Sequence, residues 1–205
     1  MKSARPSSAE DAATLGVDPS FNRTGWALLV GAPHSPPLVA CGAIIPRGSS
    51  RGERLLSIGQ QLKEALRSLR PAVAWFERPG NWQRRGGSRR ETVEAMAMAR
   101  GVMLAACAEL GVEAIEVDFQ AARRSLLGRH NAGADSILEF VRGLGVEPPR
   151  RPRGSVDMDV ANAVLMAAYG LSLRERTGCP TREVQGDRRV KLRGSETPEP
   201  AGWPT

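Results

Sequence analysis

The chain has 205 residues, of which 41% are hydrophobic and 25% charged, so it can bury a core of its own and is neither disordered nor fibrous in composition. No apolar run approaches the ~20 residues of a membrane span, no apolar stretch near the start suggests a secretory signal, and the three cysteines form no C-x-x-C pair. These features predict a soluble protein of a reducing compartment, the cytoplasm, and count against a disulfide scaffold or a zinc ribbon.

The net charge of +7 comes from 29 lysines and arginines against 22 acidic residues, and nearly all of the cations are arginine. Arginine matches phosphate geometry with paired hydrogen bonds. A GC-rich coding bias is the plain alternative for such a composition. Clustering in residues 84–90, 123–130 and 150–153 favours instead a surface that binds a polyanion.

The expected elements begin after a flexible leader, residues 1–13. Short apolar runs separated by turn residues predict an antiparallel meander of three strands, at 14–18, 24–30 and 38–45. Apolar residues at three- and four-residue steps predict a helix over 51–69. A continuous apolar run at 73–76, closed by Glu77, predicts a buried strand of the parallel type.

The second half of the chain is predicted to be mostly helical. Residues 90–110 form a predicted helix that is apolar nearly all round and therefore covered on more than one side, with Gly101 indicating a close backbone approach. A strand and three helices follow, at 114–117, 121–127, 134–144 and 157–176. The order predicts one α/β domain over 14–177, a five-stranded mixed sheet (antiparallel meander plus parallel strands) with helices on both faces, and a mobile tail at 178–205.

Acidic residues stand at the ends of several predicted elements. Asp18 ends the first strand, where Asp-Pro-Ser is also an ordinary turn. Glu77 ends the buried strand, where an ion pair with Arg78 is the structural alternative. Asp157 and Asp159 open the last helix, where the helix dipole alone favours acids.

Taken together, these residues suggest a metal centre. If the first and fourth strands are parallel neighbours, Asp18 and Glu77 converge at one end of the sheet. The last helix then brings Asp159 and Asn162 to the same end, one helical turn apart. Oxygen ligands gathered in this way suit magnesium or manganese, and two such ions can activate water and stabilise the leaving oxygen of a phosphodiester.

Five segments, in order and spacing, resemble the RuvC family of Holliday junction resolvases over most of residues 15–170. They are 15–27 (LGVDPSFNRTGWA), 53–55 (ERL), Glu77, 99–102 (ARGV) and 159–163 (DVANA). The resemblance implies an RNase H-like fold, a homodimer, and Mg²⁺-dependent symmetric nicking of branched, four-way DNA. It also implies that the catalytic positions hold two Mg²⁺ ions, or Mn²⁺ in their place; these positions are Asp18, Glu77, Asp159 and Asn162.

Asn162 departs from the family pattern, which usually has Asp at this position. Asparagine offers a carbonyl oxygen but lacks the charge. One interpretation is that Asp157 helps to hold the metal. Another is that the chain binds junctions and cuts them weakly or not at all, and a third is that Asn162 is an inactivating substitution.

The resemblance also suggests DNA contacts. Trp82, in the loop after Glu77, would insert into the junction as an apolar wedge, with a place in the core as the structural alternative. Basic residues would bind phosphates, with a merely solvated face as the alternative; they are Arg84, Arg85, Arg89, Arg90, Arg123, Arg124 and Arg129.

Two other classes compete with this interpretation. A sugar- or acetate-kinase-like ATPase also follows its first strand with Asp and a Thr-Gly step, but it needs a duplicated domain and Gly-rich phosphate loops that 205 residues do not supply. An RNase H-like enzyme that acts on RNA stays open, because the sequence does not reveal the sugar of the substrate. The sequence names no branch-migration partner.

Overall fold

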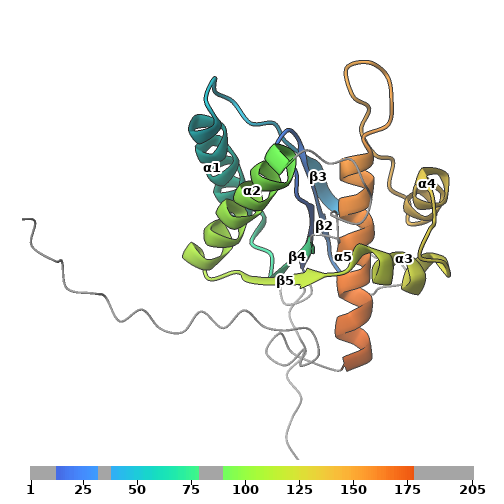
Figure 1. Ribbon diagram of the computed structural model, residues 1–205. Helices are drawn as coiled ribbons and strands as arrows, with labels where there is room; N and C mark the ends of the chain where they lie inside the picture. Colours follow the sequence, from blue (N-terminus) through green and yellow to red (C-terminus); the bar gives the residue numbers. More distant parts are fainter. Residues whose placement is uncertain (1–12, 32–37, 79–89, 178–205) are drawn as a thin grey trace, which may run out of the picture.

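The computed structural model describes residues 13–31, 38–78 and 90–177 (Figure 1). The predicted tail and the predicted leader, apart from Ala13, lie outside the described residues. So do four predicted DNA contacts, Trp82, Arg84, Arg85 and Arg89. Ala13 is itself buried, and its carbonyl accepts a hydrogen bond from the amide of Ala72 at 2.9 Å.

One five-stranded sheet forms the centre of the fold, with the strand order β3-β2-β1-β4-β5. The antiparallel meander consists of β1 (Thr14–Asp18), β2 (Thr24–Leu29) and β3 (Leu38–Ile44). On the other side of β1, β4 (Val73–Glu77) and β5 (Glu113–Val117) run parallel to it and to each other. The predicted mixed sheet is confirmed, and because β1 and β4 are parallel neighbours their carboxyl ends share one edge.

Helices cover both faces of this sheet (Figure 1). One face packs against α1 (Arg51–Leu69) and α2 (Arg90–Glu109). The other face packs against α5 (Met158–Thr177), and α3 (Phe119–Leu127) and α4 (Ala134–Gly143) pack in turn on α5. The bounds agree with the predicted elements to within two residues. In the part of the chain that the structure describes, no helix is both long and apolar enough to cross a membrane.

Strand β4 explains how one sheet serves two cores. Its side chains alternate, so Val73 and Trp75 enter the core under α5 while Ala74 and Phe76 enter the core under α1 and α2. All four side chains are fully buried. The continuous apolar run in the sequence is therefore the pattern of a strand covered on both faces.

Helix α5 lies directly on β1 and β2, because glycines face it there. A Cβ added at Gly16 would be 2.0 Å from the carbonyl oxygen of Ala163, and one added at Gly25 would be 2.1 Å from that of Asp159. Gly25 also pairs with Asp18 in the sheet. The two glycines thus let the first turns of α5 approach the strand end that carries Asp18.

Helix α2 is covered on one side by the described residues. It buries Ala99 and Met103 against the sheet and α1, but along its opposite face Val93 and Gly101 are exposed. Among the described residues, a Cβ at Gly101 would meet nothing within 4 Å. In the part of the chain that the structure describes, therefore, nothing makes the expected close approach at Gly101 or covers the second side of α2, and both stay predictions for contact with a second copy.

Candidate active site

Two carboxylates meet at the carboxyl edge of β1 and β4. Asp18 and Glu77 are the last residues of these strands, and their side chains hydrogen-bond to each other. Burial, reinforced by the charge of Glu77, raises the pKa of Asp18 well above its usual value. Burial also raises the pKa of Glu77. Because two neighbouring, partly buried carboxylates repel each other when both are charged, such a pair favours binding a proton or a cation.

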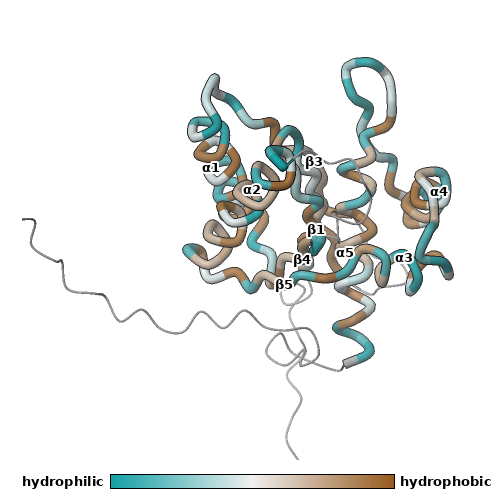
Figure 2. The backbone as a smooth tube through the Cα atoms, in the orientation of Figure 1, coloured by the Kyte–Doolittle hydropathy of each residue, from teal (hydrophilic) through white to brown (hydrophobic). Residues whose placement is uncertain are grey.

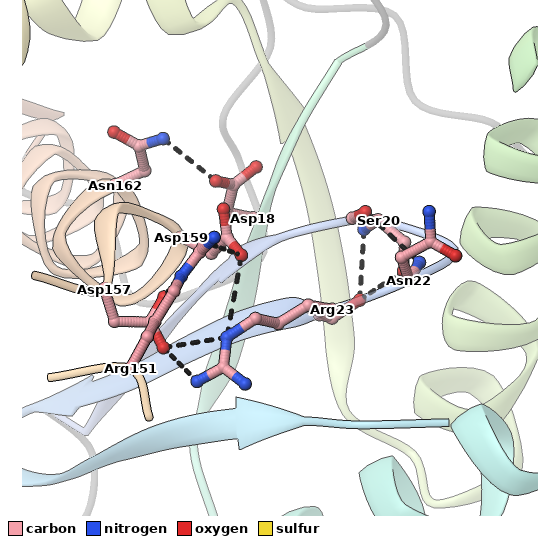
Figure 3. Close-up of polar contacts among 9 residues, drawn as sticks. Asp18, Ser20, Asn22, Arg23, Arg151, Asp157, Asp159 and Asn162 are labelled. Carbon is pink, nitrogen blue, oxygen red and sulfur yellow. Dashed lines mark hydrogen bonds and ion pairs between the residues drawn. The ribbon is translucent and has the colours of Figure 1, made fainter. Parts of the chain in front are cut away.

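Asn162 joins this pair from α5. Its amide nitrogen donates a hydrogen bond to Oδ2 of Asp18 at 2.9 Å (Figure 3). Its Oδ1 atom is buried and has no hydrogen-bond partner among the described residues. A buried acceptor left in this state is the kind of oxygen that a hard dication or a bound water would satisfy.

The donor set fits a divalent cation only if the amide takes part. Within the described ranges, no three Asp, Glu, His or Cys side chains form a group that could hold a metal ion by themselves. The carboxylates of Asp18 and Glu77, together with the unpartnered oxygen of Asn162, supply hard oxygen ligands from three different elements. The residues present therefore suit magnesium or manganese at this position.

Asp159 lies on the first turn of α5, close enough to Asp18 for its charge to raise the pKa of that residue. Its carboxylate accepts a hydrogen bond from Nη2 of Arg151 at 2.8 Å, and Nε of Arg23 is 3.8 Å away (Figure 3). Burial raises the pKa of Asp159 even with the guanidinium of Arg151 beside it. Asp159 thus connects the carboxylate pair to two arginines.

Asp157, the predicted auxiliary ligand, is occupied differently. Its side chain is completely buried, and it accepts hydrogen bonds from both Nε, at 2.8 Å, and Nη2 of Arg23. Nη2 of Arg151 is 3.4 Å from its other oxygen. Although burial alone would raise it, these guanidinium groups hold the pKa of Asp157 below its usual range. Its oxygens already have charged partners.

Helix α3 brings arginines to the same edge. Asp118 caps the helix by accepting a hydrogen bond from the amide of Gln120 at 2.9 Å. The guanidinium of Arg123 lies over the ring of Phe119, 4.4 Å from its centre, and its charge acts on Glu77 to lower the pKa of that residue against the effect of burial. Arg123 is therefore a neighbour of the carboxylate pair.

The other described arginines of the predicted DNA-contact set are exposed. Arg124 faces solvent on α3, and Arg129 donates a hydrogen bond to Oγ of Ser136 at 3.0 Å. Arg90 forms an ion pair with Glu94, one turn further along α2, at 2.7 Å. These three arginines are more accessible to an extended anion than Arg123, which is half-buried.

Sequence reasoning assigned no role at this site to Arg23, Arg151 or Arg54. Arg54 lies over the ring of Phe21, 4.9 Å from its centre, and donates a hydrogen bond to Oδ1 of Asn22 at 3.0 Å. It therefore holds the turn that follows Asp18. The signal was present in the 15–27 and 53–55 segments, but only the fold shows that they touch.

Comparison with known proteins supports the resemblance to the RuvC family. No family model matches the chain. A crossover junction endodeoxyribonuclease RuvC from Synechococcus sp. (strain WH7803) is 29% identical over 158 residues, which is 76% of this chain and 96% of the relative. The protein of that name from Nitratidesulfovibrio vulgaris (strain DP4) is 29% identical over 170 residues, covering 82% and 96% of the two chains.

Solved structures agree in fold. RuvC from T. thermophilus in complex with Holliday junction substrate superposes with a TM-score of 0.68 at 20% identity, covering 81% of this chain and 97% of that one. The yeast mitochondrial Holliday junction resolvase gives a TM-score of 0.61 at 12% identity, covering 82% and 81%. The order of the sheet and the helices on both of its faces define an RNase H-like fold class. Within that class, this chain is RuvC-like.

Proposed function

We propose that this chain is a crossover junction endodeoxyribonuclease, a metal-dependent enzyme that resolves four-way DNA junctions by symmetric nicks. The observation that carries this proposal is the pair of partly buried carboxylates, Asp18 and Glu77, with the amide of Asn162 hydrogen-bonded to Asp18, in a RuvC-like chain. The relatives named above are crossover junction endodeoxyribonucleases, and one neighbouring structure holds a Holliday junction substrate.

The proposed cofactor is Mg²⁺, with Mn²⁺ as a substitute and two ions per site, held by Asp18, Glu77, Asp159 and Asn162. When bound, such ions lower the pKa of a water molecule and neutralise charge on the leaving oxygen. The chain contributes orientation. By donating to one oxygen of Asp18, the amide of Asn162 orients that carboxylate, and its own unpartnered oxygen would reach a cation there after a flip of the amide. Hydrolysis by water needs no covalent intermediate with the protein.

The DNA would lie along the arginine-bearing side of this edge. We assign phosphate contacts to Arg124 and Arg129, which are exposed, and to Arg123 next to Glu77. Further predicted contacts come from the sequence alone or lie at the start of α2, namely the wedge Trp82 and the arginines Arg84, Arg85, Arg89 and Arg90. Branched DNA is thus the proposed partner.

We also propose a homodimer that works in the cytoplasm. Symmetric nicks in a two-fold junction require two sites related by a two-fold axis. The exposed face of α2 offers a surface for a second copy, because its side chains are small or apolar and, among the described residues, a Cβ at Gly101 would meet nothing within 4 Å. The residues of that face are Val93, Ala97, Gly101 and Ala105. In this proposal residues 14–177 form the nuclease domain, between a leader at 1–13 and a tail at 178–205.

A junction-binding protein that cuts weakly is the second candidate. Asn162 favours it, because a neutral amide replaces a carboxylate at a position where the family resemblance implies a metal ligand. The contact of Arg151 with Asp159 favours it too, since a guanidinium there competes with a cation for the same oxygens. Nicking assays with Mg²⁺ and with Mn²⁺ separate the two candidates.

The test replaces each carboxylate of the pair by its amide. Asp18→Asn and Glu77→Gln are nearly isosteric, so each should abolish nicking of a labelled four-way junction while junction binding is retained. Glu64→Gln, on an exposed position of α1, is the matched control and should cut like the parent. Undiminished cleavage by either amide variant would discard the assignment of these carboxylates to the active site.

A further inference from the structure

The loop before α5 carries the third arginine cluster, to which the proposed function gives no role. It folds back on itself as a small hairpin. Arg150 bridges Val156 in an antiparallel pair, the amide of Arg151 donates to the carbonyl of Ser155 at 2.8 Å, and the amide of Asp157 donates to the carbonyl of Pro149 at 2.9 Å. The hairpin projects beyond the end of α5 (Figure 1) and is largely hydrophilic (Figure 2).

The hairpin sorts its arginines into two groups. Arg150 and Arg153 are exposed, whereas Arg151 is directed at Asp157 and Asp159 (Figure 3). A basic surface therefore lies beside a single arginine that reaches into the carboxylate centre.

The two arginines of the centre are held differently. Arg23 binds Asp157, whose side chain is completely buried, so salt screens this ion pair less than an exposed one. Arg151 keeps 38% of its side chain exposed, and its shorter contact is with Asp159, which is itself 26% exposed. The contact between Arg151 and Asp159 is thus the one that solvent, and any other anion, can reach.

The contact between Arg151 and Asp159 limits the number of divalent cations that the chain can bind without DNA. Arg23 is the main partner of Asp157, and Arg151 is the main partner of Asp159, from which Nε of Arg23 is 3.8 Å away. The open carboxylates are then Asp18 and Glu77, with Arg123 acting on the latter. One dication suits that pair, whereas a second would need Asp159 released from its guanidinium.

We propose that Arg151 is a counter-ion of Asp159 that the substrate displaces: it holds the place of a second divalent cation in the free chain, and a DNA phosphate draws it away. A guanidinium forms paired hydrogen bonds with phosphate oxygens, so a backbone phosphate competes directly with the carboxylate. Arg150 and Arg153 would meet the same backbone and pull the hairpin with them. This inference rests on the proposed function, because it takes DNA as the displacing anion.

The consequence is that the second ion binds only together with DNA. An active site that binds its second cation only when the DNA substrate is bound has little activity on other molecules. Arg151 then changes partner rather than staying an obstacle, and its guanidinium ends beside the phosphate whose ester bond is cut.

Counting bound Mn²⁺ by electron paramagnetic resonance tests this without any cleavage. The parent chain should bind one ion alone and a second when a four-way junction is added, after the ions held by the DNA itself are subtracted. Arg151→Met should bind the second ion in the free chain about tenfold more tightly than Arg153→Met, the equivalent of ~1.4 kcal/mol. Arg153→Met is the matched control, because it removes one charge from an exposed position of the same hairpin.

Two results would overturn the inference: a parent chain that already binds two ions without DNA, or an Arg151→Met variant that binds Mn²⁺ no more tightly than Arg153→Met. Thermal unfolding checks that the variants fold, and Arg151→Gln repeats the measurement if Arg151→Met does not. The outcome is separate from the proposed function. A chain whose ion count changes as expected but which never nicks a junction would refute the nuclease and leave the role of Arg151 standing.

Discussion

Replacing Gly16 by alanine tests the contact that positions the site. The new methyl carbon would lie 2.0 Å from the carbonyl oxygen of Ala163 and 2.5 Å from the amide nitrogen of Ala167. Both atoms belong to the backbone of α5, so no side chain can rotate away. The helix must move from β1, and it carries Asp159 and Asn162 with it.

Overpacking of a core typically costs ~1–3 kcal/mol, and a clash with rigid backbone belongs at the upper end, ~3 kcal/mol. For a domain of this size that corresponds to a melting temperature lower by ~6–12 °C. Urea unfolding of Gly16→Ala beside Gly52→Ala measures the effect. The second variant, at an exposed position of α1, meets nothing within 4 Å among the described residues and should lose no stability, because alanine favours a helix over glycine. Equal stability of the two variants would refute the close packing of α5 on β1.

Asn162→Asp should raise cleavage or lower the Mg²⁺ concentration required, and Mn²⁺ should partly rescue the parent; unchanged metal dependence in a parent that already cuts briskly would remove Asn162 from the ligand set. Alanine at both Arg84 and Arg85 should flatten the slope of log K against log salt by about 1 for each lost phosphate contact, and an unchanged slope would exclude that segment from the interface. Because the pKa values of Asp18 and Glu77 are raised, the folded chain holds their protons more tightly than the unfolded chain does. Without divalent ions, the free energy of unfolding should therefore fall as the pH rises from about 4, the usual carboxyl value, through the raised pKa values, while Mn²⁺ affinity rises over the same window; a flat profile would contradict the buried pair.

The elements were predictable because their signals are local. The apolar spacing over 51–69 and the alternation of short runs with turn residues depend on neighbours in the chain, and α1 has the predicted bounds. The convergence of Asp18 and Glu77 was also predictable, because it follows from the parallel pairing of two strands. The topology of the sheet is enough to place the two carboxylates at the same edge.

What sequence reasoning missed depends on contacts between distant residues. Arg23 and Asp157 are 134 positions apart, and nothing near either residue in the sequence announces the pair. The role of Gly16 required knowing which helix crosses β1. The close approach expected at Gly101 stays a prediction for the converse reason: no described residue of the chain faces this glycine, so its partner surface is not given by the fold.

The most direct test of the account is cleavage of a synthetic four-way junction by the parent chain, beside a linear duplex of the same sequence. With Mg²⁺, we expect paired nicks at symmetric positions in the junction and none in the duplex. A chelator, or Asp18→Asn, should abolish the nicks. Equal cutting of the linear duplex, or an intact junction in both Mg²⁺ and Mn²⁺, would contradict a junction-resolving nuclease.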